Sequence, residues 1–127
     1  MEIHESSENY LEAILMVKKE KGVCRSIDVV RKLNFSKPSV SVAMSNLRKS
    51  GYITMDQDGW LDLTDAGLEI AERMYERHTI LSAWLMSIGV PEATATEDAC
   101  RMEHDMSVIT FEKIKAYLSR HRDDVEA

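Results

Sequence analysis

The chain has 127 residues, of which 44% are hydrophobic, and a net charge of −6. This length fits one domain, or one small domain with an appendage. No apolar run approaches the ~18 residues that a membrane helix needs, and the opening segment lacks the basic-then-apolar order of a signal peptide. We therefore expect a cytoplasmic protein with no membrane partner. Cys24 and Cys100 are too few for a disulfide scaffold, which leaves metal binding or redox chemistry as their special roles.

Charge is distributed unevenly along the sequence. Between Lys18 and Tyr52 there are nine Lys or Arg residues and two acidic ones, whereas from Thr64 to Ala127 there are seven basic and thirteen acidic residues. This asymmetry suggests that the first half meets phosphates, while the second half meets cations or a partner subunit.

Three helices are predicted in the first half, spanning about Ser7 to Glu20, Ile27 to Leu33, and the residues after Ser36 up to Ser50. Ser26 and Ser36 are the expected N-caps of the second and third helices, and Pro38 suits a first helical turn because its missing N–H is not needed there. Asn34 and Phe35 form the tight turn between these two helices. The pattern predicts a helix-turn-helix.

A hairpin and three more helices follow. Residues 52–55 and 60–63 alternate apolar and polar side chains around a Gly-containing turn, which predicts a β-hairpin wing. The expected helices run from the Thr64 cap to Ile88, from Pro91 to about Asp105, and from the Ser107 cap to Leu118. Residues 119–127 are polar and are expected to fray. We predict a mainly α protein with a winged helix-turn-helix domain (1–63) and a helical domain (64–127).

The helix after Ser36 is the expected DNA-reading element. In a helix-turn-helix the second helix enters the major groove with its N-terminal residues facing base edges. Short hydroxyl side chains permit close approach to the groove, and Lys37 can reach a guanine edge or a phosphate. On the opposite face, Val40, Met44 and Leu47 are expected to form the core-facing stripe. The candidate DNA contacts are Arg25, Ser36, Lys37, Pro38, Ser39, Ser41, Arg48, Lys49 and Gln57. The alternative is a small helical module whose basic residues form a solvated face.

The segment from Asp98 to Ser107 carries the most specific chemistry. Cys100, Glu103 and His104 stand at i, i+3 and i+4, so a helix presents a thiolate, a carboxylate and an imidazole on one face. Asn9 and Glu12 share a face near the N-terminus, and His78 falls within the long helix. An isolated residue such as Glu12 or His78 is more often a solvated or capping residue. The convergence of Cys100, Glu103 and His104 on one helix face is what makes that trio a candidate metal site.

These motifs together resemble the metal-dependent repressors of the diphtheria toxin repressor family, and the chain length is similar to the shorter manganese transport regulators. The resemblance extends over Glu8 to Ile14, Ser36 to Ser41, Arg77-His78 to Val90, and Cys100 to Ser107. It implies a homodimer that binds a double-stranded DNA operator when a divalent metal is present. It also implies metal ligands from the first helix, the long helix and the following helix, and it carries over Glu12, His78, Glu103 and His104.

Two positions depart from the manganese branch, which has carboxylates where this chain has Asn9 and Cys100; the iron branch has a Cys at the latter position. The second metal site of the iron branch is expected to be absent, because its ligand positions fall on Ser82 and Thr96. The full candidate set is Asn9, Glu12, His78, Cys100, Glu103 and His104, with Mn(II) or Fe(II) as the metal and Co(II) or Zn(II) as substitutes in vitro.

Three functions compete at this point. The first is a metal-activated repressor of metal-uptake genes. The second is a regulator of the same architecture with altered or lost metal dependence, which responds to another signal or to thiol redox chemistry at Cys100. The third is a metal-dependent hydrolase using Glu103 and His104, but the sequence has no recognisable nucleophile or substrate-pocket motif. We therefore expect a regulator and not an enzyme.

Overall fold

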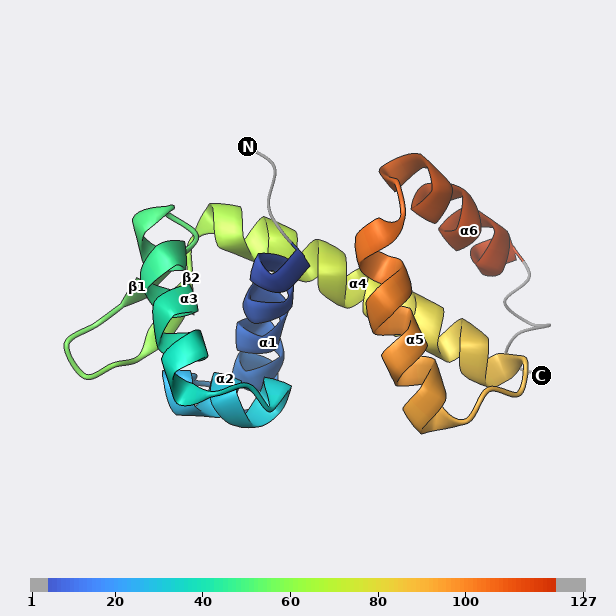
Figure 1. The fold of residues 1–127 in the computed structure, drawn as a ribbon. Helices are drawn as coiled ribbons and strands as arrows, with labels where there is room; N and C mark the ends of the chain where they lie inside the picture. Colours follow the sequence, from blue (N-terminus) through green and yellow to red (C-terminus); the bar gives the residue numbers. More distant parts are fainter. Residues whose placement is uncertain (1–4, 121–127) are drawn as a thin grey trace. The chain divides into compact units, whose positions relative to one another are not determined.

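The computed structural model describes residues 5–120, which form six helices and one two-stranded antiparallel hairpin (Figure 1). In chain order these are α1 (Glu5–Lys21), α2 (Ser26–Leu33), α3 (Lys37–Lys49), β1 (Ile53–Met55), β2 (Leu61–Leu63), α4 (Asp65–Ser87), α5 (Glu92–Asp105) and α6 (Val108–Arg120). The predicted mainly α fold with a winged helix-turn-helix is confirmed. Ser119 and Arg120 belong to α6, and the rest of the segment expected to fray lies outside the described residues.

Two compact units make up the chain, and they divide between Arg73 and Met74, inside α4. The first contains α1, α2, α3 and the hairpin, and the second contains α5 and α6. Both therefore include part of one continuous helix. None of the helices among residues 5–120 is long and apolar enough to span a membrane.

Three of the predicted helix caps are present. Ser36 Oγ accepts a hydrogen bond from the Ser39 N–H at 3.2 Å, Thr64 Oγ1 accepts from Gly67 at 3.2 Å, and Ser107 Oγ accepts from Thr110 at 3.1 Å. Each hydroxyl satisfies a backbone donor that has no partner within its own helix. The starts of α3, α4 and α6 are thus fixed by local sequence.

The predicted Ser26 cap is wrong. Ser26 is the first residue of α2, and Arg25 occupies the cap position with extended backbone. The Arg25 N–H donates to a carboxylate oxygen of Asp28 at 2.9 Å, and Lys21 contacts the other oxygen of Asp28 at 2.8 Å. A carboxylate three residues into the helix, held by a lysine of α1, replaces the serine hydroxyl as the determinant of where α2 begins.

The core of the first unit packs the inner faces of α1, α2 and α3 against the hairpin. Leu11, Ile14, Val29, Val40 and Met44 each have at most 1% of their surface exposed. Ile53 and Leu61, from the two strands, complete it. The strands pair Ile53 with Leu63 and Met55 with Leu61, and the Leu61 N–H donates to the Cys24 carbonyl at 2.8 Å, which ties the wing to the α1–α2 connection.

The core of the second unit is smaller and includes charged groups. Met74, Leu81, Ala95, Ala99 and Phe111 are buried, and they come from α4, α5 and α6. The same interior holds the side chains of Arg77 and Glu103. Alanines on the buried face of α5 give little side-chain volume, so the interior of this unit depends on polar contacts as well as apolar packing.

Gly67 occupies a position with no room for a side chain. It lies in the first turn of α4, where the Thr64 N–H donates to the Tyr52 carbonyl at 3.1 Å, and a Cβ at position 67 would be 2.0 Å from that same carbonyl oxygen. We expect Gly67→Ala to destabilise the protein by about 1–3 kcal/mol, because backbone atoms must move, although alanine ordinarily favours a helix. Urea unfolding measures this. Glu69→Ala, at an exposed position on the same helix, is the control, and equal stability of the two variants would contradict the close approach.

Candidate metal centre and DNA-reading surface

The last turns of α5 carry the predicted thiolate, carboxylate and imidazole. One ligand atom from each of Cys100, Glu103 and His104 lies within 4.8 Å of those of the other two. The spacing of three and four residues on one helix accounts for this convergence. Cys100 is partly exposed, whereas the Glu103 side chain is fully buried and that of His104 is 1% exposed.

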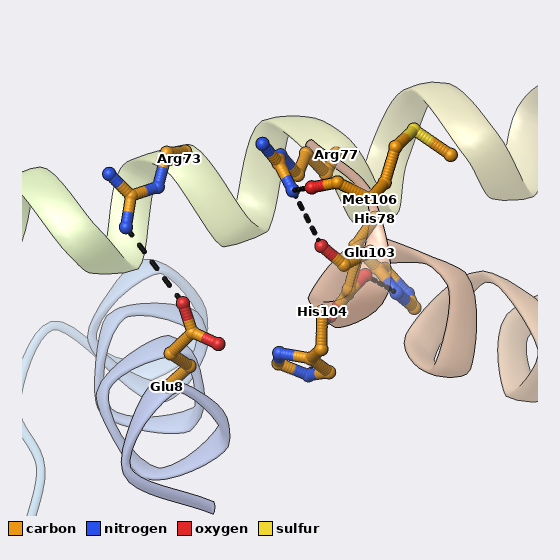
Figure 2. A network of polar contacts seen from close by, with 7 residues as sticks. All are labelled: Glu8, Arg73, Arg77, His78, Glu103, His104 and Met106. Carbon is orange, nitrogen blue, oxygen red and sulfur yellow. Dashed lines mark hydrogen bonds and ion pairs between the residues drawn. The ribbon is translucent and has the colours of Figure 1, made fainter. Parts of the chain in front are cut away.

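His78 reaches the same carboxylate from α4. Its Nδ1 lies 3.2 Å from Glu103 Oε2, while His104 Nε2 lies 3.6 Å from Glu103 Oε1 (Figure 2). Thus Glu103 stands between two imidazoles, one from each helix. The structure therefore brings together four of the six predicted ligands: His78, Cys100, Glu103 and His104.

The donor chemistry of this cluster fits a divalent transition metal. Among the described residues Glu103 Oε1 is buried and accepts no hydrogen bond, and an unsatisfied buried carboxylate oxygen is costly unless a cation or donor compensates it. Carboxylate, imidazole and thiolate are together the donors that first-row divalent metals take. Cys100, Glu103, His104 and His78 would hold such an ion.

The other two predicted ligands, Asn9 and Glu12, belong to α1 in the first unit. Glu12 is buried with 6% of its surface exposed, and Asn9 is partly exposed. One turn earlier on the same helix, Glu8 lies 3.8 Å from Arg73 of α4 (Figure 2). A carboxylate withdrawn from water on α1 is compatible with the ligand role that the sequence predicts for Glu12.

The second cysteine has a different environment. Cys24 lies in the interior of the first unit with no exposed surface. Burial, to which the negative charge of Asp28 adds, raises the pKa of the Cys24 thiol to about 12. A thiol that stays protonated at neutral pH is a poor metal ligand and a poor nucleophile, so Cys24 is a packing residue.

The predicted DNA-reading residues all lie on the surface of the first unit. Val40, Met44 and Leu47 face the core as predicted, which leaves the other side of α3 open to solvent. All nine predicted DNA contacts are exposed, namely Arg25, Ser36, Lys37, Pro38, Ser39, Ser41, Arg48, Lys49 and Gln57. The hydroxyls of Ser36 and Ser39 bond to each other at 2.8 Å, so Ser36 acts first as a cap.

Two of these residues have neighbours that bear on DNA contact. The Arg25 guanidinium lies 3.9 Å from the centroid of the Trp60 ring, which orients its charge beside the wing. Gln57 stands at the wing tip between Asp56 and Asp58. The Asp56 carboxylate organises this turn by accepting from the Asp58 and Trp60 N–H groups at 2.9 Å each, and two negative charges oppose close approach of a phosphate.

Sequence reasoning missed two residues. Val42 is 61% exposed on α3, and an exposed aliphatic side chain on a reading helix is suited to contact with a thymine methyl group. Val42 follows Pro38 by four residues, so helical spacing could have placed it on the same face as that predicted DNA contact. Arg77 is buried beside the ligand cluster, and nothing in the local sequence distinguishes it from a solvated arginine.

Comparisons with known proteins agree with this arrangement. Two protein-family models match the chain. Residues 2–61 match the N-terminal DNA binding domain of the iron dependent repressors, and residues 64–126 match their metal binding and dimerisation domain. The HTH-type transcriptional regulator MntR of Bacillus velezensis is 32% identical over 119 residues, covering 94% of this chain and 84% of that protein. MntR of Salmonella typhimurium is 31% identical, covering 94% and 76%.

Among solved structures, IdeR of T. acidophilum has a TM-score of 0.73 and 27% identity, covering 94% of this chain and 55% of the other. A helix-turn-helix unit joined to a metal-binding and dimerisation unit defines a class of metal-responsive DNA-binding regulators. The chain belongs to the iron dependent repressor family, which includes the diphtheria toxin repressor and the manganese transport regulators. It is a metal-dependent transcriptional repressor, and this family membership confirms the expectation that it is not an enzyme.

The start of α3 is exposed, so a substitution there can change DNA affinity without disturbing the core. Charge reversal in Lys37→Glu should weaken operator binding by about tenfold or more and flatten its salt dependence, because a lysine at this position contributes contact to DNA and little to the core. Fluorescence anisotropy at several salt concentrations measures both effects. Arg120→Glu makes the same charge change at an exposed position on α6. Equal losses in the two variants would show that net charge, and not the reading helix, determines affinity.

Proposed function

We propose that Fe(II) or Mn(II), held by His78, Cys100, Glu103 and His104, activates this repressor for binding to a double-stranded operator that controls metal-uptake genes. The observation that carries the proposal is the buried Glu103 carboxylate, which has an imidazole near each oxygen and one oxygen that accepts no hydrogen bond among the described residues. An ion at this position would supply the missing positive charge.

The proposal includes Asn9 and Glu12 as ligands from the DNA-binding unit. Its basis is the family resemblance, together with the burial of the Glu12 carboxylate on α1. An ion that takes ligands from both units would make the spacing of the reading helices depend on metal, which is how a small ion can control a DNA-binding surface distant in sequence.

We also propose that the active species is a homodimer. The second unit leaves large apolar side chains in water, each between 42% and 74% exposed, and these are Met86, Ile88, Val108, Ile109 and Tyr117. Apolar exposure on this scale is typical of a surface that meets another protein. A two-fold dimer would present two copies of α3 to two operator half-sites.

The donor set bears on the metal. A thiolate at Cys100 favours softer ions such as iron, cobalt and zinc, and manganese has the lowest intrinsic affinity in the first-row series. Activation also depends on which ion is available and which produces the DNA-competent geometry. We therefore propose that Fe(II) and Mn(II) both activate, with Co(II) and Zn(II) as substitutes in vitro.

Metal control of operator binding can be tested by chelation. Chelated protein should bind operator DNA weakly, and added Fe(II) or Mn(II) should restore specific binding. Glu103→Gln should lower the metal affinity by more than about 100-fold, because a negatively charged ligand oxygen is lost. Loss of a residue that only orients a ligand costs roughly 10–100-fold. Metal titration under anaerobic conditions, followed by DNA anisotropy, measures both.

Glu97→Gln is the matched control, because Glu97 is on the same helix with an exposed side chain paired to Arg101. It should respond to metal like the wild type. Full metal activation of Glu103→Gln, or operator binding by the wild type that chelation does not change, would contradict the proposed switch.

We expect the metal preference to depend on the side chain at position 100. Cys100→Glu replaces a soft thiolate with a hard carboxylate, which favours manganese. The ratio of the half-activating Mn(II) concentration to the half-activating Fe(II) concentration should therefore fall. Anaerobic operator binding with each metal gives this ratio. Cys24→Ser, at the buried cysteine, should leave it unchanged. An unaltered ratio in Cys100→Glu would mean that the Cys100 sulfur is not a ligand.

A further inference from the structure

Arg77 is a buried arginine whose contacts converge on the ligand-bearing end of α5. Only 4% of its surface is exposed. Its Nη1 donates to the carbonyl oxygens of Glu103 and Met106, each at 2.7 Å (Figure 2). Its guanidinium also lies 5.2 Å from the centroid of the Phe111 ring of α6. One side chain of α4 therefore holds the end of α5, the connection after it and α6.

These contacts satisfy groups that α5 cannot satisfy itself. The last four carbonyls of a helix have no intrahelical donor, and the C-terminus carries partial negative charge. Glu103 is in the last turn of α5, and Met106 immediately follows the helix. A buried guanidinium that donates to both oxygens thus acts as a C-terminal cap supplied by another helix.

Glu103 therefore has two contacts with residues of α4. Its backbone carbonyl accepts from Arg77, and its carboxylate lies 3.2 Å from the imidazole of the next residue, His78. Because both contacts come from adjacent positions, they limit rotation and sliding of the last turn of α5 relative to His78. That turn also carries His104 and follows Cys100, so its placement determines how closely the donor atoms converge.

We propose that Arg77 is a positioning residue for the metal centre, which sets metal affinity by fixing the backbone of the ligand-bearing turn. This inference rests on the proposed metal function. It differs from a purely structural role in one respect. A structural arginine would lower stability while the folded molecules kept their metal affinity, whereas a positioning arginine changes the affinity and ligand geometry of the folded protein.

The test compares Arg77→Lys and Arg77→Met with the same substitutions at Arg73. Arg73 is one turn earlier on α4, its side chain is 42% exposed, and its guanidinium lies 3.8 Å from Glu8. Lysine at 77 keeps the charge but lacks the planar fork, and methionine removes both. Each full-length variant is titrated with Co(II) alone, and the visible absorption bands, the binding constant and the thermal unfolding of the metal-free protein are recorded.

We expect Arg77→Lys to bind Co(II) about 10–100-fold more weakly than the wild type, with altered absorption bands, and Arg77→Met to bind more weakly still. Both Arg73 variants should match the wild type. Folded Arg77 variants with wild-type Co(II) affinity and bands would overturn the inference, as would variants that stay unfolded even with saturating Co(II). A wild-type chain that binds no Co(II) would instead overturn the metal function itself.

Discussion

A carboxylate with no exposed surface imposes the main constraint on the second unit. Removing the Glu103 side chain from water is unfavourable unless cations or donors surround it. His78 of α4 lies within hydrogen-bond distance of one carboxylate oxygen, and Arg77 fixes the Glu103 backbone. The other carboxylate oxygen has His104 3.6 Å away but accepts no hydrogen bond among the described residues. Because α5 contributes mainly alanines to the apolar core, the packing of this helix and the assembly of the ligand cluster depend on the same polar contacts.

The first unit meets a different requirement, which is to present a basic surface without disturbing its core. Val40, Met44 and Leu47 occupy the buried side of α3, so that its other side carries polar and basic groups together with the exposed Val42. The hairpin is attached by the Leu61 hydrogen bond to Cys24 and by the ion pair of Lys18 with Asp62. Negative charge is concentrated after residue 64, so a net charge of −6 does not prevent this surface from meeting phosphates.

Features that depend on nearby residues could be predicted from sequence. The caps at Ser36, Thr64 and Ser107 follow from a hydroxyl placed just before a helical pattern, and the convergence of Cys100, Glu103 and His104 follows from helical spacing. Features that depend on distant residues could not. The helix α2 begins one residue before the position predicted from the sequence, because Asp28, held by Lys21, determines its start.

The same limit applies within the candidate metal centre. The contact of His78 with Glu103 joins residues 25 positions apart, and only resemblance to a family suggested it. The burial of Arg77 was not foreseen, because nothing in its neighbours along the chain indicates that the carbonyls of Glu103 and Met106 would need a donor. Local chemistry thus indicates the candidate ligands on α5, and tertiary packing supplies the contacts that orient them.

The proposed switch depends on a divalent metal held by α5 together with His78. An anomalous difference map from crystals of the full chain grown with Mn(II) tests it most directly. We expect a metal peak about 2.0–2.3 Å from a carboxylate oxygen of Glu103 and from ring nitrogens of His78 and His104. A well-ordered map in which manganese is bound elsewhere, and in which His78 and Glu103 contact only each other, would contradict it.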